Sequence, residues 1–283
     1  MYKVLICGAD GMLGQELMRV FHNTDTIGLT RTDLDLTDHE ATAYTITKNA
    51  PDIVLNASAY NNVDGSESEE GKKMAYAVNA DAVGNCATLC AQQRIPFVHF
   101  STDYVFEGRT PEGYNETALP CPINTYGKSK LRGEQFIQEQ MRAFYIIRLS
   151  RLFGKPGTSE EGKKSFVDLM LTLGRTRPEL KVIDDQWSKP TYAPDLAHSV
   201  YALIHNKAPY GIYHLPNEDA CTWYTFAKEI FSHAHITTPL IPVPTSAFPR
   251  PATIPSHTLL QNTKQPLLRS WKQALHEYLE TVQ

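Results

Sequence analysis

The run Lys3-Val4-Leu5-Ile6-Cys7-Gly8-Ala9-Asp10-Gly11-Met12-Leu13-Gly14 decides the fold of this chain. The residues before Gly8 suit a short buried strand, and residues 12–22 suit the helix that follows. Between such a strand and helix, the first glycine allows a tight turn and the second admits a pyrophosphate to the backbone. The third lets the helix pack closely on the strand, with its N-terminus facing the phosphates. The run therefore predicts a dinucleotide-binding strand–turn–helix unit.

Apolar strands and helical patterns go on alternating to about residue 150. The expected strands cover residues 26–29, 52–56, 97–102 and 144–149, and the expected helices include residues 72–93 and the segment around Tyr126. This alternation predicts an α/β fold with a Rossmann-type, doubly wound parallel sheet and right-handed crossovers. Residues 195–205 and 211–215 look like a further helix and strand of the same sheet.

We expect two domains. Residues 1–150 form the dinucleotide-binding domain, residues 190–216 return to it, and residues 151–189 and 217–283 form a smaller C-terminal substrate-binding domain. Prolines gather late in this second domain, as is typical of loops, before a final helix from about Ser270. The smaller domain is expected to cover the carboxyl ends of the strands, where α/β sheets bind ligands.

Three residues form a candidate catalytic set: Thr102, Tyr126 and Lys130. Thr102 ends an apolar strand, while Tyr126 and Lys130 stand four residues apart and so share one helix face. An ammonium beside a phenol favours the phenolate, so we expect the pKa of Tyr126 to fall below its usual value of about 10. The phenol could pass a proton to a developing alkoxide while Thr102 donates a hydrogen bond to the same oxygen. The set predicts hydride transfer to a ketone.

The second strand indicates the choice of cofactor. It runs into Leu29-Thr30-Arg31, where an acidic residue would be needed to hold a ribose 2′-hydroxyl. Arg31 can instead pair with a 2′-phosphate, which favours NADP(H) and leaves NAD(H) possible. The alternative is a solvated loop arginine. Asp35 and Leu36 are candidates for the border of the adenine site, and carboxylates in this segment can cap the next helix.

Composition excludes several classes of function. The net charge of −4 gives no basic surface for nucleic acid, and no apolar run approaches the ~18 residues that a membrane span needs. The five cysteines are odd in number and scattered, so neither a disulfide framework nor a metal site is predicted. We expect a cytoplasmic enzyme without a nucleic-acid or membrane partner.

Several runs spread over nearly the whole chain carry a resemblance to a known family. They are Asn56–Tyr60, Val63-Asp64, Val78-Asn79, Ser101–Phe106, Tyr126–Glu134, Asp185-Gln186, Pro190-Thr191, Asp195–Ala197, Gly211–Leu215 and Pro244–Ala252. In these runs the chain resembles dTDP-4-dehydrorhamnose reductases, which are extended short-chain dehydrogenase/reductases. The Gly-x-x-Gly-x-x-Gly spacing is typical of that extended type. Dehydratase relatives tend to have an acid where this chain has Tyr104.

The resemblance implies reduction of the C4 ketone of dTDP-4-dehydro-6-deoxy-L-mannose to dTDP-L-rhamnose. By position, Thr102 orients the ketone, Tyr126 is the acid, and Lys130 supports both Tyr126 and the nicotinamide ribose. The expected cofactor contacts are Gly8, Asp10, Gly11, Met12, Leu13, Gly14, Arg31, Asp35, Leu36, Ala57, Ser58, Ala59, Tyr60, Tyr126 and Lys130. The expected contacts to the sugar nucleotide are Val63, Thr102, Asp103, Tyr104, Arg151 and Gln186.

The chain departs from the family pattern at two positions. Arg151 stands where the family commonly has a tryptophan at the sugar, and Ile254 stands where a second Arg-Pro pair is usual. One hypothesis is that the Arg151 cation replaces the missing cation near the diphosphate. The alternative is that Arg151 faces solvent and Ile254 packs in its loop. Some relatives bind Mg²⁺ at a dimer contact through an acid at the position of Glu16, but an ordinary exposed helix glutamate is the preferred interpretation.

Two other functions stay open. One is a non-catalytic, NADP-binding regulatory subunit, since the β subunit of methionine adenosyltransferase shares this fold. The other is a sugar-nucleotide epimerase or dehydratase that retains NAD. The intact set of Thr102, Tyr126 and Lys130 favours the reductase, which we expect to be a monomer or a homodimer.

Overall fold

Six parallel strands form the central sheet of the computed structural model, which describes residues 2–158 and 164–282. Their order across the sheet is β10-β5-β4-β3-β1-β2. The strands are β1 (Lys3–Cys7), β2 (Asp25–Leu29), β3 (Ile53–Asn56), β4 (Phe97–Thr102), β5 (Phe144–Leu149) and β10 (Gly211–His214). All neighbours pair in parallel, which confirms the predicted α/β fold with a doubly wound sheet.

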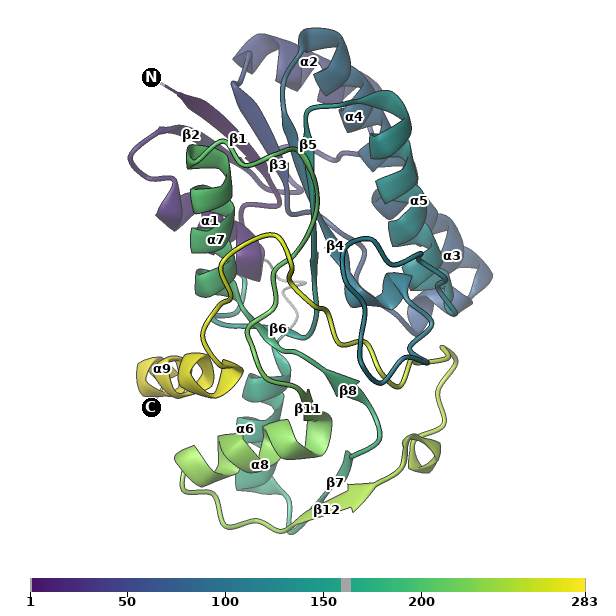
Figure 1. Ribbon diagram of the computed structural model, residues 1–283, viewed down its shortest axis with the longest axis vertical. Helices are drawn as coiled ribbons and strands as arrows, with labels where there is room; N and C mark the ends of the chain where they lie inside the picture. The colour runs from purple at the N-terminus through teal and green to yellow at the C-terminus, as the bar shows by residue number, and fades with distance from the viewer. Residues whose placement is uncertain (1, 159–163, 283) are drawn as a thin grey trace.

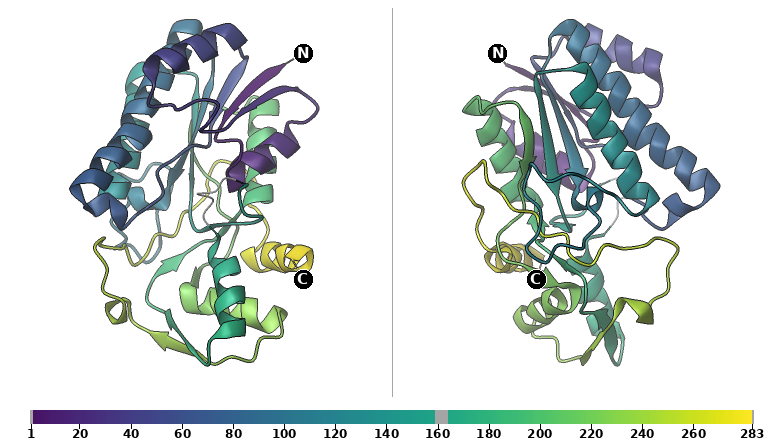
Figure 2. Two further views of the ribbon diagram at one scale, coloured as in Figure 1. Left: turned by 180° about the vertical axis from the view of Figure 1, so that it is seen from behind. Right: turned by 45° about the vertical axis from the view of Figure 1, so that its right-hand side comes forward.

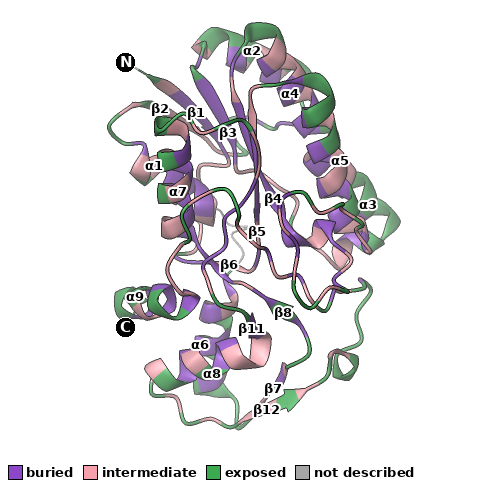
Figure 3. Ribbon diagram, in the orientation of Figure 1, coloured by how far each residue is buried: buried purple, intermediate pink, exposed green. Residues whose placement is uncertain are grey.

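Helices cover both faces of this sheet (Figures 1 and 2). On one face lie α1 (Met12–Val20) and α7 (Ala193–His205); on the other lie α2 (His39–Asn49), α4 (Ala82–Gln93) and α5 (Thr125–Gln140). Alternate residues of β1 enter opposite cores: Val4 and Ile6 pack with α1 and α7, while Leu5 and Cys7 pack with α4 and α5. Burial on both faces explains why the strands read as continuous apolar runs (Figure 3).

The helix predicted over residues 72–93 is not a single α-helix. It begins earlier, as α3 (Glu69–Tyr76), passes through a π-helical turn (Ala77–Asp81) and continues as α4. Asn79 in the π turn is buried, and its side-chain amide donates to the carbonyl of Tyr60 (3.0 Å) and accepts from the Tyr60 N–H (2.9 Å). π turns of this kind are frequent at functional sites. Through these two hydrogen bonds, the π-helical turn holds the loop that follows β3 in place.

A smaller lobe lies below the carboxyl ends of the strands (Figure 1). Its elements are β6 (Leu152–Phe153), α6 (Phe166–Thr176), β7 (Leu180–Ile183), β8 (Trp187–Ser188), β9 (Thr191–Tyr192), β11 (Cys221–Thr222), α8 (Trp223–His233), β12 (Leu240–Val243), η4 (Thr245–Ala247) and α9 (Trp271–Val282). It has its own apolar core, in which Phe226, Ile230, Trp271 and Leu275 are buried. The start of α9 agrees with the helix expected from about Ser270.

A long strap, residues 248–264, runs from η4 back between the two lobes (Figure 1). Its backbone is tied to β8 by the Trp187 N–H and the Ser256 carbonyl (2.6 Å), and to the larger lobe by the Tyr114 N–H and the Leu259 carbonyl (2.8 Å). The strap therefore closes one side of the region between the lobes. Among the described residues, no helix is long and apolar enough to cross a membrane.

Candidate active site

The N-terminus of α5 is held in place by side chains from two other segments. Asn124 caps the helix by accepting a hydrogen bond from the Gly127 N–H (2.8 Å). The carboxylate of Glu67, in a 3₁₀ turn (η1, Gly65–Glu67), accepts from both the backbone N–H (2.8 Å) and the hydroxyl (2.9 Å) of Thr125. An acid near a helix N-terminus is favourable because of the helix dipole. These contacts fix the helical turn that carries Tyr126.

Glycine at position 127 brings this helix close to the end of β4. A Cβ atom at Gly127 would lie 2.2 Å from the carbonyl oxygen of Tyr104, which no side chain could tolerate. Tyr104 belongs to the 3₁₀ turn (η3, Asp103–Val105) that directly follows Thr102. The Tyr-Gly pair therefore allows the phenol of Tyr126 to reach the hydroxyl at the strand end.

The hydroxyls of Thr102 and Tyr126 meet at this point. The Thr102 side chain lies near enough to the phenol of Tyr126 to oppose the rise in its pKa, and Tyr104 packs edge-on against the phenol ring with 6.0 Å between ring centroids. Thr102 also donates to the Asp103 carboxylate (3.2 Å) and accepts from the Tyr104 N–H (3.2 Å). The Thr102 hydroxyl and the Tyr126 phenol therefore lie close together, and both could donate to one carbonyl oxygen if Thr102 turned its proton away from Asp103.

The expectation of a lowered pKa for Tyr126 is wrong. Burial raises the pKa of this phenol above its ordinary value, the charge of Asp103 raises it further, and only the hydrogen bond with Thr102 opposes the rise. Lys130 does not contribute, because its Nζ donates to the carbonyl of Phe100 (2.6 Å) and lies 3.2 Å from Nε2 of His99. The phenol therefore carries its proton at neutral pH, which is the form that an acid needs in order to reduce a ketone.

The glycine run fits a dinucleotide. Gly8 adopts a φ of +77°, and a Cβ there would lie 2.8 Å from Oγ of Ser58. A Cβ at Gly14 would lie 2.0 Å from the Gly8 carbonyl oxygen, so α1 can approach the turn only with glycine at that position. Gly11 is the N-cap of α1 and provides no side-chain cap, so the first helical N–H groups are available to phosphate oxygens. Asp10, Met12 and Leu13 lie in the same turn and first helical residues.

The residues expected around the cofactor follow β1, β2 and β3. The segment that directly follows β3 consists of Ala57, Ser58, Ala59 and Tyr60. Asn56, the last residue of β3, pairs in register with Cys7, the last residue of β1. Arg31 is exposed just beyond β2, and its charge helps lower the pKa of Asp35, although hydrogen bonds from Thr37 contribute more. Leu36 is buried in the core beside Leu34 rather than at the surface.

Asp103 is one of the residues predicted to contact the sugar nucleotide, and that contact stays a prediction. It is buried, and its carboxylate accepts hydrogen bonds from the hydroxyls of Thr102 (3.2 Å), Ser188 (3.3 Å) and Thr258. Burial raises the pKa of Asp103 to about 6, and the hydrogen bonds from Thr258 and Thr102 and the charge of Arg151 oppose this rise. The arrangement fits a residue that joins β4, β8 and the strap and orients Thr102.

Arg151 is not a solvent-facing side chain, so the alternative is wrong for this residue, while the packing of Ile254 in its loop stays a prediction. It is half-buried, with its guanidinium 3.9 Å from the ring centroid of Trp223, and it donates to the carbonyl oxygens of Gln186 (2.7 Å) and Cys221 (3.0 Å). The side chain of Gln186 forms two hydrogen bonds: it accepts from Trp223 Nε1 (3.0 Å) and donates to the Thr245 hydroxyl (3.0 Å). These residues form one wall of the small lobe, and Arg151 lies near enough to Asp103 and Tyr104 to interact with them electrostatically.

The sequence indicated no functional role for Glu67 or for the Asp64–Arg250 ion pair (2.9 Å), and it indicated Asn79 only as part of a run that carries the family resemblance. That ion pair ties the loop after β3, where Val63 lies, to the strap. Asp64 and Arg250 lie in two of the runs that carry the family resemblance, and this was the only signal for the pair in the sequence. Glu16 forms an ion pair with Arg19 (2.7 Å), and no group of three or more potential metal ligands occurs among the described residues.

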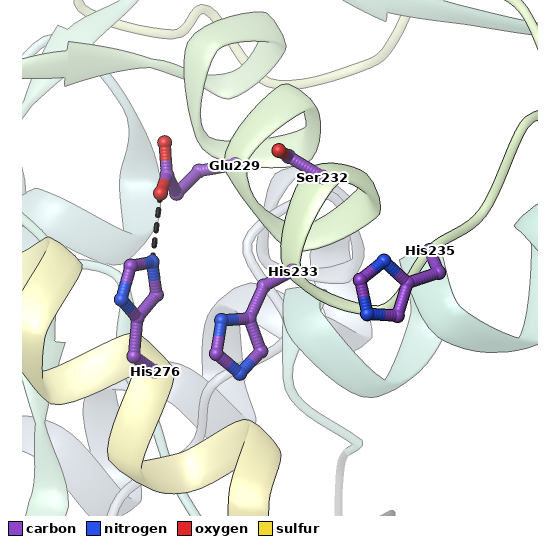
Figure 4. A pocket seen from close by; sticks show the side chains of 5 residues that line it. All are labelled: Glu229, Ser232, His233, His235 and His276. Atoms are coloured by element: carbon purple, nitrogen blue, oxygen red, sulfur yellow. Dashed lines mark hydrogen bonds and ion pairs between the residues drawn. The ribbon is translucent and has the colours of Figure 1, made fainter.

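A separate shallow hollow lies between α8 and α9, within the small lobe (Figure 4). It is lined by Glu229, Ser232, His233, His235 and His276. The ring of His276 stacks on that of His233 and lies 2.7 Å from the Glu229 carboxylate. None of these side chains belongs to the strands or helix that carry Thr102 and Tyr126.

Comparison with known proteins gives a consistent result. The model of the RmlD substrate binding domain family matches residues 2–283. The spore coat polysaccharide biosynthesis protein SpsK of Bacillus subtilis is 37% identical, over 99% of this chain and 98% of its own. The dTDP-4-dehydrorhamnose reductase of Escherichia coli is 33% identical, over 93% of this chain and 90% of its own.

Solved structures extend this comparison. The dTDP-4-dehydrorhamnose reductase of Bacillus anthracis, crystallised in complex with NADP, has a TM-score of 0.93 and 35% identity, covering 99% of this chain and 100% of that one. The UDP-glucose 4-epimerase of Thermus thermophilus, in complex with NAD, has a TM-score of 0.81 at 18% identity, which shows a common fold only.

Proposed function

We propose that this chain, which belongs to the RmlD substrate binding domain family, reduces the C4 ketone of dTDP-4-dehydrorhamnose to dTDP-L-rhamnose with NADPH. The chain is an NAD(P)H-dependent oxidoreductase by the same evidence. The observation that carries the proposal is the meeting of the Thr102 and Tyr126 hydroxyls at the end of β4.

The proposed chemistry needs only these residues and the cofactor. When bound, the cofactor supplies the hydride. Thr102 and Tyr126 donate hydrogen bonds to the ketone oxygen and stabilise the negative charge that develops on it. The O–H bond of Tyr126 breaks as this oxygen becomes a hydroxyl, and the phenol is left as a phenolate until a solvent proton restores it.

NADP(H) is the preferred cofactor, and NAD(H) is possible. The Bacillus anthracis relative is named as a complex with NADP. In this chain Arg31 follows β2, at the position where an acid would select NAD(H). We propose that Arg31 pairs with the 2′-phosphate, and that the glycine turn and the segment after β3 hold the rest of the dinucleotide.

The small lobe is proposed to select the sugar. Relatives differ in the reaction for which they are named: one from Streptomyces niveus, 34% identical over 80% of this chain, is a dTDP-4-keto-6-deoxy-D-glucose reductase. Specificity can vary in this way when catalytic groups sit on rigid elements and the substrate is contacted by loops. We propose that Tyr104, Arg151 and the Gln186 backbone form the part of the site that meets the deoxysugar. The two-domain division at residue 150 and the monomeric or homodimeric state stay predictions.

An assay of NADPH oxidation tests the function. Purified protein is mixed with NADPH and either dTDP-4-dehydrorhamnose or the corresponding UDP-linked 4-ketosugar, and the sugar product is identified. Oxidation with the dTDP sugar supports the proposal. Tightly bound NAD in the purified protein, with no net consumption of NADPH, would favour an epimerase or dehydratase. Cofactor binding without any turnover would favour a regulatory subunit.

A further inference from the structure

The strap, residues 248–264, is hydrogen-bonded to the larger lobe beside three candidate site residues. One attachment lies next to Val63, one next to Thr102, and one two residues before Tyr126. The pairs of strap and lobe residues are Arg250–Asp64 (2.9 Å), Thr258–Asp103 and Thr253–Asn124 (2.9 Å). Of these three pairs, the last one reaches α5, the helix that carries the proposed acid.

Asn124 uses both ends of its side-chain amide. Its Oδ1 accepts from the Gly127 N–H (2.8 Å) and so caps α5, while its Nδ2 donates to the Thr253 carbonyl. Because an N–H needs an acceptor and a carbonyl needs a donor, these two partners fix the direction in which the amide points. Only 2% of the Asn124 surface is exposed, so a lost partner would leave a buried polar group unsatisfied. A single side chain therefore joins the first turn of α5 to the strap.

Helix capping by itself does not require an asparagine at this position. Serine and aspartate cap helices about as well as asparagine does, and in this chain Asp38 caps α2 and Ser68 caps α3. An ionised aspartate has no donor for the strap carbonyl, and serine has one oxygen in place of the two polar atoms of the amide. The hydrogen bond to the strap is the contact that the amide adds to the cap.

The strap lies close against the larger lobe just after Thr253. The Ser256 hydroxyl and the His257 N–H both donate to the Gly108 carbonyl, at 2.9 and 3.0 Å. Gly108 adopts a φ of +74°, and a Cβ there would lie 2.4 Å from Cβ of Pro255, so glycine allows this approach. The strap backbone is thus fixed near the lobe, with the Thr253 carbonyl presented to the cap of α5.

We infer that Asn124 is a positioning residue that acts through Tyr126: its amide fastens the first turn of α5 to the strap and so holds the phenol beside Thr102. The strap begins at η4 in the small lobe, which is proposed to meet the deoxysugar. The contact therefore joins the lobe that selects the sugar to the helix that carries the acid. This role depends on the proposed function only in that Tyr126 is taken as the acid.

Hydrogen–deuterium exchange tests the link between strap and helix, and it does not depend on turnover. Asn124→Ser and Asn124→Asp both keep a cap for α5 and lose the amide donor to the strap. The reporters are the amides of His257 and Gln261, which donate to the Gly108 and Tyr114 carbonyls in the wild-type protein. We expect strap peptides to exchange about fivefold faster in both variants, the change in a local opening equilibrium that one lost hydrogen bond produces. Wild-type exchange of the strap in both variants would overturn the inference.

Steady-state kinetics test the consequence for Tyr126. We expect kcat to fall by about tenfold or more in both variants, because a displacement of ~1 Å in a reacting group can cost ~10²-fold in rate. The rate is expressed per NADPH-binding site, so that unfolded protein does not count. NADPH affinity should stay within about threefold, since Asn124 serves the phenol and not the dinucleotide, and capping is kept. Wild-type kcat in both variants would contradict the positioning role even if the strap exchanged faster.

A matched control is available on α2. Asp38 caps that helix by accepting from the Ala41 N–H (2.9 Å), within its own first turn. Asp38→Ser repeats the exchange of one cap residue for another, and it should leave strap exchange and kcat at their wild-type values. Equal effects in this control would contradict the inference. Absence of turnover in the wild-type protein would instead contradict the proposed function and leave the exchange result to decide the inference.

Discussion

The hydroxyl of Thr102, at the end of β4, lies beside the phenol of Tyr126, in the first turn of α5, and opposes the rise in the pKa of that phenol. This proximity depends on Gly127, because a Cβ there would collide with the backbone that follows Thr102. A carbonyl oxygen that enters between the two hydroxyls meets both donors at once.

Replacing Tyr126 with phenylalanine should reduce kcat by ~10²- to 10⁴-fold, the usual contribution of general acid catalysis, and leave NADPH affinity within a few-fold. Steady-state kinetics and fluorescence titration measure the two effects. Tyr224→Phe is a suitable control, since Tyr224 and Lys228 repeat the spacing on α8 away from the site. A Tyr126→Phe variant with more than about a tenth of wild-type activity would show that another group is the acid.

Arg31→Ala should weaken NADPH binding by ~1.5–3 kcal/mol, the range for charge-assisted hydrogen bonds, and leave NADH binding unchanged. The reason is that only NADPH carries the 2′-phosphate. Calorimetric titration with each cofactor measures the difference. Equal losses for both cofactors, or no loss for either, would mean that Arg31 is a solvated loop residue.

Arg151→Ala should raise the KM for the sugar nucleotide by tenfold or more, since a lost charged hydrogen bond is worth ~1.5–3 kcal/mol. The guanidinium holds the Gln186 and Cys221 carbonyls and stacks on Trp223, so its removal should loosen this wall. NADPH affinity should barely change. Ile254→Ala is the matched control in the strap. An unchanged KM in Arg151→Ala would show that the wall does not meet the substrate.

Lys130→Met should stabilise the protein at pH 7 while it abolishes turnover. The pKa of Lys130 falls from 10.5 to about 8, so the buried ammonium destabilises the folded state fully below pH 8, and the effect disappears as the pH rises toward 10.5. At 1.36 kcal/mol per pH unit, the lowered pKa corresponds to a destabilisation of about 3 kcal/mol at pH 7, which methionine removes. The variant also loses a hydrogen bond worth ~1 kcal/mol, so its free energy of unfolding should rise by about 2 kcal/mol. The free energy of unfolding of both proteins, measured with denaturant, should show the gain in stability at pH 7 and its loss at pH 10. A variant less stable than wild type at pH 7 would contradict the sign of this effect.

The sheet and its helices were predictable because their signals are local. Apolar runs and the Gly8–Gly14 spacing determine β1 and α1, and the capped segment before Tyr126 determines α5. The π-helical turn around Asn79 was not predictable, since one extra residue in a helical turn leaves no change in composition.

The candidate site was predictable only in part. Spacing correctly placed Tyr126 and Lys130 on one helix, but it could not show that Nζ turns toward Phe100 and His99 instead of the phenol. The partners of Arg151 are main-chain carbonyls of residues distant in the sequence, and any residue type provides such a carbonyl. Pairing of this kind depends on the tertiary structure and leaves no pattern in the sequence.

The most direct test of the proposed reaction follows the hydride itself. The protein is incubated with dTDP-4-dehydrorhamnose and NADPH that carries deuterium at the transferable position of its nicotinamide, and the sugar product is analysed by NMR and mass spectrometry. We expect one deuterium at C4 of dTDP-L-rhamnose for each NADPH consumed, and no product from Tyr126→Phe on the same timescale. Product without deuterium at C4, or no product with wild-type protein that binds NADPH, would contradict the proposal.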